Sequence, residues 1–318
     1  MPISKYDIEL DLSEPSDSSH WHLADLIGSN KRVLDVGCST GYFGEALIAA
    51  GNECWGIEYD VASARVAAER LDRVEVADLE AVELAAVFPD ETFDAVVFAD
   101  VLEHLRDPLT TLRAARHILR PGGAVYVSLP NIAHGDIRLA LLKGRFKYTK
   151  TGILDNTHTR FFTRDNLSEF AKDAGFVVAE LRGTHADLFS TEQRLQASDY
   201  DAAVVDLVRE DPLSSIYQFV AVLVPADATS LATSQALRMQ DLELQNSRLV
   251  AQAEEHGTAA HEFRKFSEQL TAELAEARAS AADQAARAAQ LEAEIARMSE
   301  AASEPPRTLR EKLRERLR

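Results

Sequence analysis

An α/β fold, in which helices cover both faces of a parallel sheet, is the architecture that this 318-residue sequence predicts for its first two thirds. Up to Pro225, short apolar runs rich in β-branched residues alternate with stretches of helical periodicity, which is typical of parallel sheets. The runs are apolar throughout, as expected for strands buried on both faces. After Pro225 glycine almost disappears, and alanine, glutamate, glutamine and arginine dominate. The sequence therefore predicts a globular α/β domain followed by a long helical segment.

Seven strands are expected, five in the first half of the domain and two near its end. They lie at 32–36, 53–58, 73–77, 93–99, 123–129, 176–182 and 217–224. Helices are expected at 42–50, 61–70, 107–119 and 163–174. Asp107 and Pro108 are a favourable N-cap and first residue for the third of these helices. The stretch 131–160 lacks clean periodicity and is rich in Asn, His, Gly and aromatic residues, so we expect an insertion near the ligand side of the sheet.

The segment from 231 to about 304 carries a heptad pattern in which fourteen of eighteen seam positions are apolar. This pattern predicts a coiled coil, and so narrow an apolar stripe favours pairing with another chain, either a second copy or a helical partner. The last residues are basic, with leucine at every fourth position; they are either an amphipathic helix for an anionic lipid surface or a solvated, frayed end. We therefore divide the chain into an N-terminal extension (1–19), the globular domain (20–225), the coiled coil (226–304) and a basic tail (305–318).

Bulk properties exclude several classes of protein. The net charge of -18 repels phosphate groups, so general nucleic-acid binding is not expected. The two cysteines, Cys38 and Cys54, fit neither a metal framework nor a disulfide scaffold. The polar, acidic N-terminus has no apolar core typical of a signal peptide, and no window approaches the roughly 18 apolar residues of a membrane span. We expect a cytoplasmic protein.

The clearest motif is VLDVGCSTGYFGEAL at residues 33–47. A buried strand ends in Asp35 and Gly37, a turn with Cys38 follows, and Gly41 opens a helix at Tyr42. In open α/β sheets ligands bind beyond the carboxyl ends of the strands, beside such helix N-termini. Glycine at these positions lets the backbone approach a ligand closely. The motif therefore indicates a nucleotide-binding corner.

The next three strands end in acidic residues. Glu58 is placed to accept hydrogen bonds from both ribose hydroxyls of a nucleoside, and Tyr59 is placed to pack on adenine. Asp78, followed by Leu79, is placed to accept from an exocyclic amine, and Asp100 ends the fourth strand. A nicotinamide dehydrogenase is the obvious rival, but the turn lacks G-x-G-x-x-G and no second substrate domain follows.

These motifs resemble those of class I S-adenosylmethionine-dependent methyltransferases, and more narrowly those of a bacterial group associated with glycosyltransferases of surface-polysaccharide assembly. The residues that carry the resemblance are SSH at 18–20, VLDVGCSTG at 33–41, GIEYD at 56–60, DVLEHLRDP at 100–108, LRPGG at 119–123, SLPNIAH at 128–134, RLALLKGRFKY at 138–148, GILDNTHTRFFT at 152–163 and DAGF at 173–176. Ser39 departs from the commoner GCGTG form of the first motif. The resemblance implies a Rossmann-like seven-stranded sheet with an antiparallel last strand. It also implies a methionine pocket shaped by Asp35, Gly37 and Gly41, with Glu58 on the ribose and Asp78 facing adenine.

The run DVLEH suggests how a hydroxyl acceptor would lose its proton. On a helix, Asp100, Glu103 and His104 would share one face. A further histidine from the insertion would complete a divalent metal site, for which Mg²⁺ or another hard cation would suit. One alternative is that His104 acts as a general base without a metal. The other is that the DVLEH run only caps the edge of the sheet and has no catalytic role. His134 and His158 of the insertion are further catalytic candidates.

The acceptor stays open at this point. A sugar hydroxyl of a surface glycan or its precursor follows from the narrower resemblance, with a glycosyltransferase as a partner held by the coil. A quinone or another small aromatic molecule is the alternative acceptor. A third reading is a coiled-coil scaffold that carries a catalytically silent domain.

Overall fold

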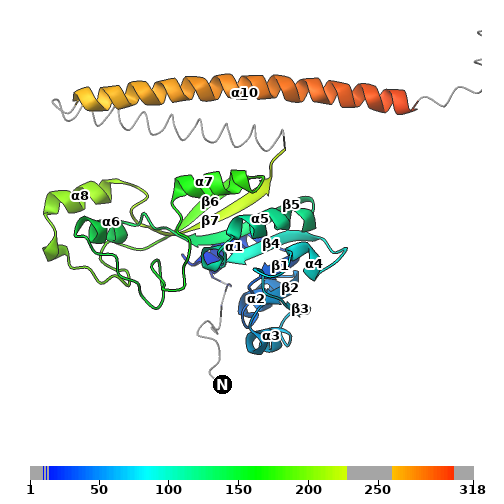
Figure 1. Ribbon diagram of the computed structural model, residues 1–318, viewed down its shortest axis with the longest axis horizontal. Helices are drawn as coiled ribbons and strands as arrows, with labels where there is room; N and C mark the ends of the chain where they lie inside the picture. The colour runs from blue at the N-terminus through cyan, green and yellow to red at the C-terminus, as the bar shows by residue number, and fades with distance from the viewer. Residues whose placement is uncertain (1–9, 11, 13, 228–259, 304–318) are drawn as a thin grey trace, which may run out of the picture. The chain divides into compact units, whose positions relative to one another are not determined.

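The computed structural model describes residues 10, 12, 14–227 and 260–303, and the chain divides into two compact units, Met1–Ala226 and Asp227–Arg318. Figure 1 shows the first unit as a single sheet with helices packed against it. Seven strands form the sheet in the order β3-β2-β1-β4-β5-β7-β6. The strands are β1 (Arg32–Val36), β2 (Glu53–Glu58), β3 (Arg73–Val76), β4 (Phe93–Ala99), β5 (Leu119–Pro130), β6 (Phe176–His185) and β7 (Ile216–Pro225).

All seven strands that the sequence predicts are present, and β1, β2 and β4 have the predicted bounds. The β1, β2, β3, β4 and β5 strands pair in parallel, whereas β7 runs antiparallel to β5 and β6. Because the parallel strands point the same way, their carboxyl ends meet at one edge of the sheet. The antiparallel last strand agrees with the expectation drawn from the resemblance.

Alternate residues of the central strands enter two separate cores, which is why helices cover both faces. Leu34 packs with α4 (Leu84–Val87), α5 (Pro108–Ala115) and α7 (Arg164–Asp173). Its neighbour Val33 packs with α1 (Ser19–Ile27), α2 (Tyr42–Ala49) and α3 (Val61–Ala67) on the other face. This period of two along apolar strands requires cover on both sides.

The helices begin where the sequence supplies caps. Asp107 accepts a hydrogen bond from the backbone of Thr110, with Pro108 as the first helical residue of α5, as predicted. Thr163 and Asn166 form a reciprocal capping box at the start of α7.

The insertion differs from the expectation because it contains α6 (Gly135–Leu142), which packs against α8 (Ala202–Glu210). The sequence does not reveal α6 because its small and polar residues, Gly135 and Asp136, are buried while Leu141 and Leu142 are exposed. This inverted pattern removes the amphipathic signal.

The second unit contains α10 (Ala260–Ser303), a continuous helix. A helix here agrees with the predicted helical segment, whereas the coiled coil and its pairing with another chain remain predictions. Residues 228–259 of the predicted coil, the basic tail 305–318 and residues 1–9 of the extension lie outside the described residues. Among the helices that the structure describes, we find none with the length and apolar content needed to span a membrane.

Candidate active site

The turn after β1 is built by two glycines that no other residue would replace without cost. Gly37 has φ of +81°, and an added Cβ would lie 2.7 Å from Cγ2 of Val101. Gly41 has φ of +79°, and its Cβ would lie 3.0 Å from the backbone of Ala67 in α3. Both conformations are strained for residues with a side chain. Gly37 thus shapes the turn, and Gly41 lets α2 start close to α3.

Cys38 contributes to this turn through its backbone amide and through its thiol, which donates to the carbonyl of Ser39 over 3.9 Å. Its side chain is 2% exposed. A Cβ added to Gly56 in β2 would lie 2.6 Å from the Sγ of Cys38. The backbone amides of Gly37 and Cys38 both donate to the carbonyl of Ile57 at the end of β2. The Cys38 thiol therefore packs against β2, and a cofactor contact of Cys38 through its backbone remains a prediction.

Glu58 points into the turn, as a ribose-binding residue must. One carboxylate oxygen accepts from the backbone amide of Ser39 over 2.9 Å, and the other from the amide of Asp60 over 2.8 Å. The side chain is 7% exposed. These bonds hold the carboxylate between the ends of β1 and β2, where the sequence places a nucleoside.

Asp35 lies beneath the same turn and is 2% exposed. Burial raises the pKa of its carboxyl to about 7, and the nearby charge of Glu58 adds to the effect. A buried carboxyl of this kind is costly to ionise unless a cation approaches it. The site is therefore complementary to a positively charged ligand.

The adenine side of the corner is more open. Asp78 follows β3, is exposed, and accepts from the amide of Glu80 over 2.9 Å. Leu79 packs partly against the core, while Tyr59 is 75% exposed. Their contacts with adenine remain predictions, and both exposed side chains are accessible to a ligand.

Asp100 is not on a common helical face with Glu103 and His104, contrary to the sequence-based expectation. Its φ is +55°, and only Leu102–His104 forms a short 3₁₀ helix, η1. One Asp100 oxygen accepts from the Ser128 hydroxyl over 2.7 Å and from the Gln218 amide over 2.8 Å. Asp100 therefore does not join Glu103 and His104 as the expected third metal ligand, and another residue lies beside these two.

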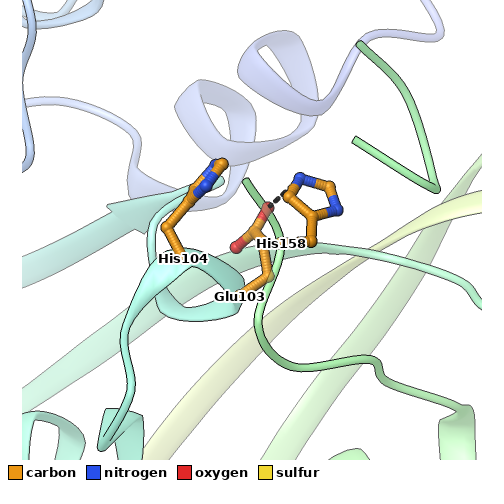
Figure 2. A group of neighbouring side chains, drawn as sticks. All are labelled: Glu103, His104 and His158. Carbon is orange, nitrogen blue, oxygen red and sulfur yellow. Dashed lines mark ion pairs between the residues drawn. The ribbon is translucent and has the colours of Figure 1, made fainter. Parts of the chain in front are cut away.

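The cluster at this place consists of Glu103, His104 and His158, whose candidate ligand atoms all lie within 4.8 Å of one another. Figure 2 shows the Glu103 carboxylate directed toward the ring of His158, at 4.0 Å from its Nε2. Glu103 is 1% exposed, and within the described part of the chain neither of its carboxylate oxygens has a hydrogen-bond partner. Burial, with the charge of Asp100, raises the pKa of Glu103 well above its ordinary value. An unsatisfied buried carboxyl calls for a ligand or a proton.

The Nδ1 atom of each histidine ring takes part in a hydrogen bond that constrains its tautomer. Nδ1 of His158 donates to the carbonyl of Ile153 over 3.0 Å. The Thr157 hydroxyl donates to Asp155 over 2.6 Å, so it accepts from Nδ1 of His104 over 3.1 Å. In the neutral tautomer that this bond requires, Nε2 is the His104 nitrogen without a proton. Burial lowers the pKa of His104, aided by the neighbouring His158.

The insertion reaches the sheet through backbone bonds. The amides of Thr159 and Arg160 both donate to the carbonyl of Glu103, which brings His158 over η1. The sequence does not indicate that Asp155 and Thr157 orient the ring of His104. The loop that carries them contacts η1 across more than fifty residues of sequence, and no local pattern encodes such a contact.

His134 has a structural role in place of the expected catalytic one. It is fully buried at the start of α6. Its Nδ1 accepts from the amide of Asp136 over 3.1 Å, and its Nε2 bonds to the carbonyl of Ala186 over 3.0 Å. Both ring nitrogens are occupied, so His134 anchors the insertion.

Known proteins that are similar to this chain include methyltransferases. Residues 18–181 match a family model described as a methyltransferase domain. A ubiquinone biosynthesis O-methyltransferase of Aromatoleum aromaticum is 33% identical over 161 residues, which cover 49% of this chain and 68% of the relative. The Pseudomonas putida enzyme of the same name is 30% identical over 190 residues, or 58% and 80% of the two chains.

Among solved structures, a SAM-dependent methyltransferase from Archaeoglobus fulgidus aligns with a TM-score of 0.47 and 18% identity, over 65% of this chain and 94% of that one. The match of the family model to more than half of the chain, together with the sheet order and the acidic strand ends, identifies the family. The chain belongs to the class I S-adenosylmethionine-dependent methyltransferases.

Proposed function

We propose that this methyltransferase acts on the phenolic hydroxyl of a quinone-type aromatic acceptor. The single observation that carries the proposal is the cluster of Glu103, His104 and His158 after the end of β4, whose candidate ligand atoms lie within 4.8 Å of one another. The relatives reported above are named for ubiquinone biosynthesis, and none of these for polysaccharide assembly. They favour the aromatic alternative over the expected sugar acceptor.

The donor side of the site has the residues that S-adenosylmethionine needs. Bound there, this cofactor supplies an electrophilic methyl carbon. In this proposal Glu58, held at the ends of β1 and β2, would bind the ribose, and the buried carboxyl of Asp35 would face the cationic methionine end. The residues orient the donor, because in-line placement of nucleophile, carbon and sulfur is the main requirement of the transfer.

The acceptor side removes a proton. As the acceptor oxygen bonds to the methyl carbon, the carbon–sulfur bond breaks, its electron pair stays on sulfur, and the hydroxyl proton passes to Nε2 of His104 or His158. A phenol has a pKa near 10, judged from tyrosine, well below that of a sugar hydroxyl. Since proton transfer to imidazole becomes easier as the acid strengthens, this base suits a phenol better.

As an alternative to a histidine base, the same three side chains fit a divalent cation, which the imidazole nitrogens would then ligate. Two imidazole nitrogens and one carboxylate oxygen suit zinc, manganese or iron better than Mg²⁺, which prefers oxygen ligands. The unpartnered oxygens of buried Glu103 support this fit, as do the bonds from Ile153 and Thr157 that orient the rings. Such a cation would lower the pKa of a bound hydroxyl.

The test is methyl transfer from radiolabelled S-adenosylmethionine to a panel of a catechol, a monophenol and free sugars. We expect transfer to the catechol, with kcat about 10² to 10⁴ lower in His158→Ala and an unchanged affinity for the cofactor. Transfer to sugars alone would overturn the proposal.

A second measurement separates an enzyme from a silent scaffold. Titration calorimetry with S-adenosylmethionine should give a saturable heat in the wild type. The absence of heat would favour the scaffold. Thermal-shift titration with Zn²⁺, Mn²⁺ and Mg²⁺ on wild type and Glu103→Gln tests the cation, and equal shifts in both proteins would count against it.

A further inference from the structure

Glu192 lies in the loop between β6 and α8 and binds the backbone of the insertion. One carboxylate oxygen accepts from the backbone amide of Ile153 over 2.9 Å, and the other accepts from the Tyr217 hydroxyl of β7 over 2.9 Å. Gly152 makes room for this contact, because its φ is +91° and a Cβ there would overlap the Glu192 carboxylate. Three segments that are far apart in the sequence thus meet at one carboxylate.

The loop that carries Glu192 is held by a buried carboxylate of α6. Asp136, which is 0% exposed, accepts from the amide of Phe189 over 2.6 Å and from the hydroxyl of Thr191 over 2.5 Å. Phe189 has a φ of +71°, a conformation that costs energy for a residue with a side chain and persists where its surroundings enforce it. The position of Glu192 therefore depends on the whole loop and not only on its own two bonds.

Ile153 connects Glu192 to His158. The Ile153 side chain is 0% exposed and packs with Ile137 and Leu154. Its amide donates to Glu192, and its carbonyl accepts from Nδ1 of His158 over 3.0 Å. Because a carbonyl can only accept, this bond requires a proton on Nδ1. The direction of the Ile153 carbonyl thus determines how the ring of His158 is oriented.

We propose that Glu192 is a positioning residue for His158, acting through the backbone of Ile153 and itself held by the Tyr217 hydroxyl. Burial raises the pKa of Tyr217, and the charge of Glu192 adds to the effect, so the hydroxyl stays a donor at neutral pH. Residues that orient a functional histidine from behind typically change activity or metal affinity about 10- to 100-fold when they are replaced. The inference rests on the role proposed above for His158.

Glu192→Ala in the full-length protein should release the ring of His158. Nitrogen NMR of isotope-labelled histidine at pH 8, above the ordinary pKa of imidazole, distinguishes a protonated from an unprotonated ring nitrogen. Wild-type His158, assigned by the signal that disappears in His158→Gln, should be protonated at Nδ1. In Glu192→Ala we expect a mixture of Nδ1 and Nε2 protonation, because the carbonyl that fixes the proton is no longer held. An unchanged His158 signal would overturn the proposal.

The second readout is kcat for methyl transfer to the catechol. Glu192→Ala should lower kcat about ten- to a hundredfold and change the affinity for S-adenosylmethionine by less than about twofold. Glu192→Gln should keep most of the wild-type rate, since its amide oxygen can still accept from the Ile153 amide. Equal losses of kcat in the two variants would contradict the positioning role. A wild type without methyl transfer would count against the proposed acceptor, whereas the nitrogen spectra would still decide the role of Glu192.

Asp211→Ala is the matched control. Asp211 also accepts from one backbone amide, that of Leu213 over 2.9 Å, and from one side chain, that of Arg138 over 2.6 Å. These partners lie before β7 and in α6, outside the loop that carries His158. The control should lower the Tm by a similar amount and leave the His158 signal and kcat unchanged. Equal changes of signal and rate in Asp211→Ala and Glu192→Ala would assign the effect to a loosened insertion and overturn the proposal.

Discussion

Replacing Asp35 by asparagine should stabilise the unliganded fold, although Asp35 belongs to the cofactor site. The pKa of the carboxyl rises from 3.8 in the free side chain to about 7 in the fold. Each tenfold change in the proton equilibrium is worth about 1.4 kcal/mol, so the ionised carboxylate costs the fold about 4 kcal/mol. The neutral amide of asparagine avoids this cost.

The pH dependence follows from the direction of the shift. As the pH rises above 3.8, the unfolded chain releases the Asp35 proton while the folded protein keeps it, so stability falls until about pH 7. The stability gap between Asp35→Asn and wild type should therefore widen by about 1.4 kcal/mol per pH unit across this window and level off above it. At pH 8 the gap corresponds to about 10 °C in Tm for a domain of this size.

Thermal unfolding followed by tryptophan fluorescence measures this gap, because the two tryptophans, Trp21 and Trp55, lie in the first unit. The same variant should bind S-adenosylmethionine about ten- to a hundredfold more weakly, since it loses a charged partner for the ammonium group. Parallel melting curves of the two proteins from pH 5 to 8, with no change in the gap, would refute the reasoning about burial.

Three further changes test other parts of the structure. Gly37→Ala should lower the free energy of unfolding in urea by about 2–4 kcal/mol, because it adds backbone strain and a clash with Val101. The control is Gly122→Ala, which has a φ of +80° but open space around it and should lower the free energy of unfolding less. Equal losses of stability in the two variants would contradict the clash. Glu58→Gln should weaken S-adenosylhomocysteine and 5′-methylthioadenosine alike by about tenfold in calorimetry, since both carry the ribose; a loss for one ligand only would be inconsistent with this role. Truncation after Ala226 should reduce the sedimentation mass to a monomer if α10 pairs with another chain, and an unchanged number of chains per particle would exclude such pairing.

The sheet could be predicted from the sequence because its strands are short apolar runs with clear boundaries. The runs containing Val33 and Val96 are buried on both faces, and no other element gives that pattern. Glu58 was also predictable, because the end of a parallel strand places its side chain at the ligand edge. These inferences need only local patterns and the rule for strand ends.

The acceptor side could not be predicted in the same way. His158 reaches Glu103 because the insertion pairs with the backbone of η1, and no periodicity encodes that contact. His134 looked equally suited to catalysis, but its ring nitrogens serve the amide of Asp136 and the carbonyl of Ala186. The positive φ of Asp100 broke the helical face on which the expected metal set depended.

A crystal structure with S-adenosylhomocysteine tests the central claim most directly. The account predicts ribose hydroxyls hydrogen-bonded to Glu58, the amino-acid end over β1 beside Asp35, and the sulfur facing Glu103, His104 and His158. A ligand bound elsewhere, or a carboxylate of Glu58 that stays on the amides of Ser39 and Asp60 without touching the ribose, would contradict it.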